Sequence, residues 1–255
     1  STGCLMFLVL GFANGIAQGF GVMVSHAFGA KDFPRLKHYV ALSLLLTIVI
    51  SVILTVPTVT ASRVFLEWMK TPENIIGIAD SYIKVIFGGI LLTMSYNVAS
   101  GILRGIGDSR TPLYFLILAG TVNALLNMFL VIVFGLGVAG VAIATVVSQM
   151  ISCVLVLGCL RRTDACYKLY PSKLSMKKEY LIQIFQVGVP AGIQSTVINF
   201  SNALLQSSVN SFGSIAMAGY TAANNVLGFL FVSVNSVTQA CMSFTSQNFG
   251  VGKYK

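Results

Sequence analysis

The sequence contains few charged residues: Asp, Glu, Lys and Arg make up 9% of its 255 residues, and only 7 of them are acidic. Hydrophobic residues make up 56% of the chain, and its mean hydropathy is +0.85. A soluble domain carries about 25% charged residues, which keep its surface in water. The composition therefore excludes a soluble globular domain and indicates a protein embedded in a membrane.

Long apolar runs occupy the stretches that lack charge. A helix needs about 20 apolar residues to cross a bilayer. Runs of this length cover residues 3–25, 39–61, 78–103, 112–134, 138–160, 181–211 and 215–249. Barrel strands are much shorter, so the predicted fold is an all-α bundle that crosses the membrane several times.

Acidic residues are absent from the middle of every predicted span. The four on one side are Asp32, Asp108, Asp164 and Glu179, and the three on the other are Glu67, Glu73 and Asp80. The chain therefore has no intramembrane carboxylate for a proton relay. It also has no glycine-rich phosphate loop and no His, Cys or carboxylate cluster for a metal. We expect neither an enzyme nor an ATP-driven pump, and no resident cofactor.

The net charge of +9 is distributed unevenly between the two sides of the predicted bundle. Most of the 16 Lys and Arg residues follow alternate spans: Lys31, Arg35, Lys37, Arg104, Arg110, Arg161, Arg162, Lys168, Lys173, Lys177, Lys178, Lys253 and Lys255. Loops rich in Lys and Arg face the cytoplasm in membrane proteins. This distribution predicts an inner-membrane protein with cytoplasmic basic loops, and it argues against a nucleic-acid surface.

An internal repeat is present. Residues 14–30 align with 235–251 in Asn, Gln, Ser and a final Phe-Gly pair. Repeated spans are typical of transporters built from related halves. We therefore interpret residues 1–160 as an N-terminal lobe that lacks its first helix, residues 161–180 as a linker, and residues 181–255 as the first two helices of a second lobe.

Polar residues recur every three or four positions in several spans, so each set lies on one helical face. The sets are Asn14, Gln18, Gly21 and Ser25; Thr93, Asn97, Ser100 and Arg104; Thr145, Ser148, Gln149 and Ser152; and Gly192, Ser195, Asn199, Asn202, Gln206 and Asn210. Such polar stripes are costly against lipid. They could hold helices together by hydrogen bonds, but their number favours a water-filled cavity.

Three stretches resemble the multidrug and toxic compound extrusion (MATE) family: LRGIGDSRTP at 103–112, the run from 122 to 149, and GVPAGIQ at 188–194. The resemblance covers the family's second to eighth helices. It implies a monomeric secondary antiporter with twelve helices in two lobes. Such a protein exports organic, often cationic, compounds in exchange for Na⁺ or H⁺ by alternating access.

The loop motif within the first stretch has a structural interpretation. Glycines permit a tight turn, a proline suits the first turn of the next helix, and an aspartate can cap that helix. We expect a structural role for Arg104, Gly105, Gly107, Asp108 and Pro112.

The resemblance is strongest to the DinF-like branch of the family, and it implies a cation-coupling site at Asn97, Asn123, Asn127 and Thr145. Many relatives carry an Asp where this chain has Asn127. An amide oxygen can ligate Na⁺ but cannot carry a proton at neutral pH, so the coupling ion stays open. Hydrogen bonding between helices is the alternative role for the amides.

The substrate path is predicted along five amides: Asn199, Asn202, Gln206, Asn235 and Gln239. A lipid-linked saccharide flippase of the same superfamily is one rival, but it would need cationic side chains in its central cavity, and Lys and Arg avoid the spans. A membrane scaffold or sensor is another rival, and it would be expected to carry a soluble effector domain or an extended tail.

Overall fold

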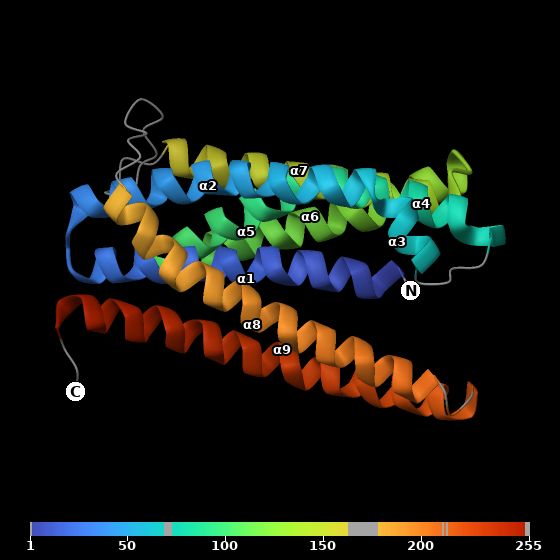
Figure 1. The fold of residues 1–255 in the computed structure, drawn as a ribbon. Helices are drawn as coiled ribbons and strands as arrows, with labels where there is room; N and C mark the ends of the chain where they lie inside the picture. The colour runs from blue at the N-terminus through green and yellow to red at the C-terminus, as the bar shows by residue number, and fades with distance from the viewer. Residues whose placement is uncertain (1, 69–72, 163–177, 211, 213, 253–255) are drawn as a thin grey trace.

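The computed structural model describes residues 2–68, 73–162, 178–210, 212 and 214–252, and within these ranges it is helical (Figure 1). The helices are α1 (Thr2–Gly29), α2 (Phe33–Thr60), α3 (Ser62–Trp68), α4 (Glu73–Gly88), α5 (Ile90–Gly105), α6 (Arg110–Met128), the π-helix η1 (Phe129–Val133), α7 (Gly137–Arg162), α8 (Lys178–Asn210) and α9 (Ser214–Val251). Most of the predicted linker, residues 163–177, lies outside the described part. An all-α polytopic fold is confirmed.

The third predicted span is broken in two. Helices α4 and α5 meet at Gly88 and Gly89 with a bend of 41°. Two adjacent glycines weaken a helix locally. A side chain at position 89 would also place its Cβ 2.8 Å from Val146 Cγ2 of α7. Counting this pair as one span, up to six described segments are long and apolar enough to cross a membrane.

The bundle has two distinct ends, which we call the basic end and the far end. The basic end holds the α1–α2 and α5–α6 turns and the last residues of α7 and α9, with Lys31, Arg110 and Arg161 (Figure 1). The far end holds the start of α4 and the turns before α7 and α9. Two ion pairs lie near it, Arg63 with Glu67 at 3.3 Å and Lys84 with Asp80 at 2.6 Å.

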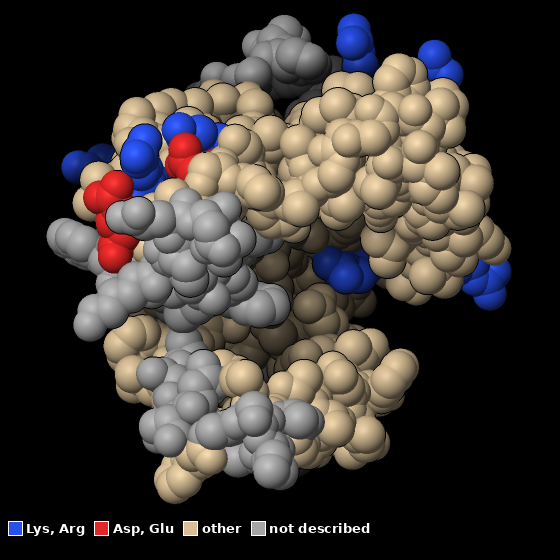
Figure 2. All heavy atoms as spheres, turned by 90° about the vertical axis from the view of Figure 1, so that its right-hand side faces the viewer, with Lys and Arg blue, Asp and Glu red and all other residues tan. Residues whose placement is uncertain are grey.

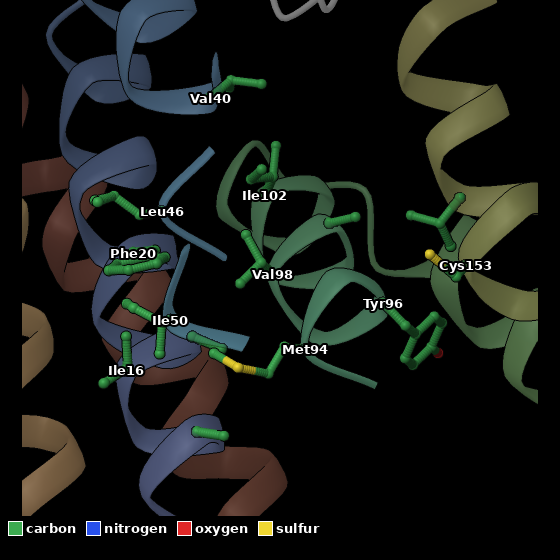
Figure 3. Close-up of a cluster of buried hydrophobic side chains, with 14 of the residues drawn as sticks. Ile16, Phe20, Val40, Leu46, Ile50, Met94, Tyr96, Val98, Ile102 and Cys153 are labelled. Carbon is green, nitrogen blue, oxygen red and sulfur yellow. The ribbon is translucent and has the colours of Figure 1, made fainter. Parts of the chain in front are cut away.

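Helix α5 lies at the centre of the first seven helices. Its apolar side chains Met94 and Ile102 belong to one buried cluster with Phe20 of α1, Leu46 of α2 and Cys153 of α7 (Figure 3). Helix α6 instead turns large apolar side chains outward, as Ile117 and Leu125 are 58% and 62% exposed. Such a surface suits lipid or further helices.

Helix α8 crosses α1 at glycines on both helices. A Cβ on Gly19 would lie 2.4 Å from Gly188 Cα, and one on Gly15 would lie 2.5 Å from the Ala191 carbonyl oxygen. The two backbones therefore touch. Small residues spaced four apart allow this approach between membrane helices.

Gly19→Ala is expected to lower the stability of the protein, because a methyl group at this crossing must push α8 away, at a cost of about 1–3 kcal/mol. Gly120→Ala on α6 is the matched control, since a Cβ there meets no other atom within 4 Å. Thermal unfolding in detergent measures both changes. Equal melting temperatures for the two variants would contradict the α1–α8 contact.

Candidate functional site

A cleft lies between α9 and the helices α1 and α5 and opens toward the far end, while α8 stays packed on α1 (Figure 2). Near the basic end it narrows to a pocket of about 240 Å³. Three helices supply the polar lining: Asn14, Gln18 and Ser25 from α1, Asn97 and Arg104 from α5, and Gln239 and Ser243 from α9. The cleft therefore has a polar floor.

The polar stripes predicted on the first and third spans meet in this pocket. Asn97 Nδ2 donates a hydrogen bond of 2.7 Å to Asn14 Oδ1, which joins α5 to α1. One turn further, Gly21 faces Gly101 closely enough that an added Cβ would lie 3.5 Å from the Gly101 carbonyl oxygen. The small residues bring the helices together and leave the amides at the pocket wall.

The cleft is closed at the basic end by hydrogen bonds from α9. Ser246 Oγ donates to the Val22 carbonyl oxygen of α1 at 2.7 Å, and Gln247 Nε2 donates to the Gly105 carbonyl oxygen of α5 at 2.7 Å. Farther along the same end, Gln183 of α8 accepts hydrogen bonds from Arg35 and Tyr39 of α2. Several helix pairs thus hold α9 and the start of α8 to the first seven helices at the basic end, in addition to the α1–α8 glycine crossing.

The two repeat segments contact each other in a reciprocal way. A Cβ on Gly29 would lie 2.0 Å from the Gln247 carbonyl oxygen, and one on Gly250 would lie 2.2 Å from the His26 carbonyl oxygen. In the alignment of 14–30 with 235–251, Gly29 corresponds to Gly250 and His26 to Gln247. Each contact is therefore the counterpart of the other, as a pseudo-twofold axis between α1 and α9 requires.

An amide cluster joins α6 to α7. Asn123 Nδ2 lies 3.3 Å from Ser148 Oγ and 3.5 Å from Thr145 Oγ1, and Asn123 Oδ1 accepts a hydrogen bond of 3.1 Å from Asn127 Nδ2. Asn127 Oδ1 is buried and has no hydrogen-bond partner within the described residues. Leaving such an acceptor unsatisfied costs about 1–3 kcal/mol, so this oxygen is available to accept from a donor or to ligate a cation.

Asn97 lies apart from this cluster, although the sequence analysis grouped it with Asn123, Asn127 and Thr145. Its side chain points to α1, whereas Ser95, two residues earlier, contacts Cys153 of α7. Helical periodicity turns these two positions to different faces of α5. Three of the four predicted coupling residues thus lie together, and the fourth belongs to the pocket.

The loop motif has the geometry expected for most of its residues. Gly107 has a φ of +95°, and Asp108 Oδ1 accepts a hydrogen bond of 3.0 Å from the backbone N–H of Thr111 in the first turn of α6. Pro112 is buried, and its carbonyl oxygen accepts from the Tyr96 hydroxyl at 3.3 Å. Gly105 lies against Ser25, whose Oγ would be 2.7 Å from an added Cβ.

Arg104 departs from the structural role expected for it, because it lines the pocket. The loop motif predicted a structural role for Arg104, whereas its helical spacing placed it in the polar stripe of Thr93, Asn97 and Ser100. Its position in the pocket agrees with the stripe, and the signal is its place one helical turn after Gly101 and two after Asn97. The argument that Lys and Arg avoid the interior does not hold for Arg104.

The residues predicted for the substrate path are divided. Gln239 lines the pocket, and Asn235 and Gln239 line an adjoining space between α9 and the α5–α6 turn. Asn199 instead packs on α1, where its Nδ2 would lie 2.2 Å from a Cβ on Gly11. Asn202 and Gln206 are exposed on α8 and do not line either space.

The chain is similar to known membrane transporters over nearly all its length. The sequence profile of the family described as MatE matches residues 1–129 and 190–255. The chain is 33% identical to the "Probable multidrug resistance protein YoeA" and 30% identical to the "Probable multidrug resistance protein YpnP", both of Bacillus subtilis (strain 168). Each match covers 98% of this chain and 56% of the relative, so the chain spans about half the length of these proteins.

A solved structure has the same fold. It is described as "Outward-facing conformation of a multidrug resistance MATE family transporter of the MOP superfamily". The TM-score is 0.87 at 21% sequence identity, over 98% of this chain and 56% of that one.

Asn123→Ala is expected to loosen α6 from α7, because it removes the hydrogen bonds to Thr145, Ser148 and Asn127. We expect a loss of about 0.5–2 kcal/mol, in the range of hydrogen bonds between membrane helices. Thr121→Ala is the control, since the Thr121 hydroxyl is exposed and bonds only to its own helix at Ile117. Unfolding of both variants in detergent should separate them, and a control as destabilised as Asn123→Ala would contradict the cluster.

Proposed function

The chain belongs to the MatE family, and from this premise we propose that the protein is a secondary transporter that exports organic compounds. The observation that carries the proposal is the cleft, which has a polar floor, opens at the far end and is closed at the basic end. The names of the similar curated proteins, which are multidrug resistance proteins, support the same substrate class.

The orientation of the cleft follows from charge. Lys31, Arg110 and Arg161 mark the basic end, and such residues face the cytoplasm by the positive-inside rule. In the cytoplasmic membrane the cleft would then open to the outside. This is the state in which a transporter releases its cargo. Uptake from the cytoplasm requires α9 to separate from α1 at Gly29 and Gly250, which would open the basic end.

We propose Na⁺ as the coupling ion and the α6–α7 amide cluster as its site. The buried oxygen of Asn127 lacks a partner, and the hydroxyl of Thr145 and the amide of Asn123 lie in the same cluster. Neutral oxygens are ligands that suit a hard cation. A proton would need a titratable group, and the cluster is made of amides and hydroxyls. Asn97 is assigned to the pocket and not to this site.

Na⁺-driven efflux is the expected behaviour of the protein as its gene encodes it, reconstituted in vesicles with a fluorescent organic cation. Na⁺ and pH gradients are imposed separately. Asn127→Leu removes the free oxygen and should abolish most of the response to Na⁺, by analogy with the 10–100-fold losses that follow changes around metal ligands. Thr121→Val, on an exposed position of the same helix, should respond as the parent does.

Three results would count against these proposals. Efflux driven by the pH gradient alone would reject Na⁺ as the coupling ion but leave export in place. The absence of efflux under either gradient would reject export of this class of compound. Asn123→Ala should also weaken coupling, and unchanged antiport rates in that variant would reject the amide cluster as the ion site.

A further inference from the structure

We propose that Arg104 binds an oxyanion, a carboxylate or a phosphate, at the closed end of the cleft. The ligand would be an amphiphile whose anionic group enters the pocket while the remainder lies in the cleft. This inference rests on the proposed export function, because it takes the cleft as the route of the exported compound. It identifies molecules that carry a negative group as one class of substrate.

The charge of the pocket supports an anion. Arg104 contributes a positive charge, and the other polar residues that line the pocket carry neutral amides or hydroxyls; among the described residues, the lining contains no Asp or Glu. The same holds for the adjoining space, which Arg104 also lines. The nearest carboxylate along the chain is that of Asp108, which caps α6 through Thr111. The positive charge of Arg104 is therefore not neutralised by an acid in the lining.

The hydrogen-bonding capacity of Arg104 is also unused. Its Nε is buried and has no partner, and within the described ranges no hydrogen bond or ion pair involves its guanidinium. A buried donor left without a partner is costly, more so when it is charged. A guanidinium offers paired N–H groups in one plane, which match the two oxygens of a carboxylate or phosphate.

Arg104 differs in position from the other basic residues at this end. Arg110, Arg161 and Arg162 are exposed, as expected of residues that interact with solvent and lipid headgroups. Arg104 lies instead between α1 and α9, within reach of Gln239 and Ser243 on the opposite wall. Figure 2 shows basic side-chain atoms inside the hollow of the molecule. Interaction with the α5 C-terminal dipole would not require this inward placement.

The size of the pocket defines how much of the ligand enters it. A volume of about 240 Å³ is below the range of about 300–1,000 Å³ that holds a drug-sized molecule. It is large enough for a carboxylate or phosphate group with its adjacent atoms. The apolar part of the ligand would extend along the cleft.

Equilibrium binding tests the proposal without any ion gradient, so it can fail or succeed independently of transport. The protein as its gene encodes it is placed in phosphatidylcholine nanodiscs and titrated with three fluorescent probes. They are dansylglycine, its methyl ester, and the phosphate monoester of dansylethanolamine. We expect both anions to bind more tightly than the ester. Arg104→Gln should weaken the anions by about 10–100-fold and leave the ester unchanged.

Two further variants give the test its controls. Arg104→Lys keeps the charge but loses the planar pair of donors, so it should retain part of the affinity for the anions. Arg110→Gln removes the same charge from an exposed position at the same end and should leave all three probes unaffected. An equal loss for all probes in Arg104→Gln, or the same loss in Arg110→Gln, would overturn the proposal.

The parent protein alone provides a second test in case Arg104→Gln fails to fold. If the ester binds as tightly as the two anions, the pocket does not select a negative group and the proposal is wrong.

Where the anions are preferred, replacing part of the lipid with phosphatidylglycerol identifies the source of the oxyanion. Displacement of dansylglycine by this lipid would indicate a lipid headgroup at Arg104, and its absence would indicate a soluble amphiphile.

Discussion

The contact between α1 and α9 at the basic end determines where the cleft is closed. Gly29 and Gly250 bring each backbone so close to the other that any side chain would overlap a carbonyl oxygen of the facing helix. Glycine is needed at both positions for this reason. Because the helices touch there and separate toward the far end, the cleft exists and its floor lies between α1, α5 and α9.

Central helix α5 separates two sets of polar residues, those of the pocket and those of the α6–α7 amide cluster. On one face, Asn97 and Arg104 join the pocket, where the second side of the cleft supplies Gln239 and Ser243. On another face α5 packs on α7, which carries Thr145 and Ser148 of the neutral amide cluster. A charged pocket open to the cleft and a neutral cluster inside the first seven helices suit different ligands. A movement of α5 would therefore affect both the pocket and the amide cluster.

Much of the architecture could be predicted from the sequence, and the failures have identifiable causes. Apolar length located the spans, but it could not reveal the break at Gly88 and Gly89, because a bend between two helices leaves hydropathy unchanged. Helical spacing identified the polar faces, as Asn14 and Asn97 illustrate. It could not tell which neighbour each face meets, so Asn199 was expected in the path but packs on α1. For the same reason, Arg104 was assigned both to a polar stripe and to a loop motif, and the spacing alone could not decide between them.

Glycine contact between α1 and α9 closes the basic end. The most direct measurement places spin labels at Lys31→Cys and Val251→Cys, two exposed positions beyond that contact, in a cysteine-free background. We expect a short, narrow distance distribution between the two labels, which becomes longer and broader when Gly250→Leu is added. An unchanged distribution in that variant, or a broad one in its parent, would contradict this closure.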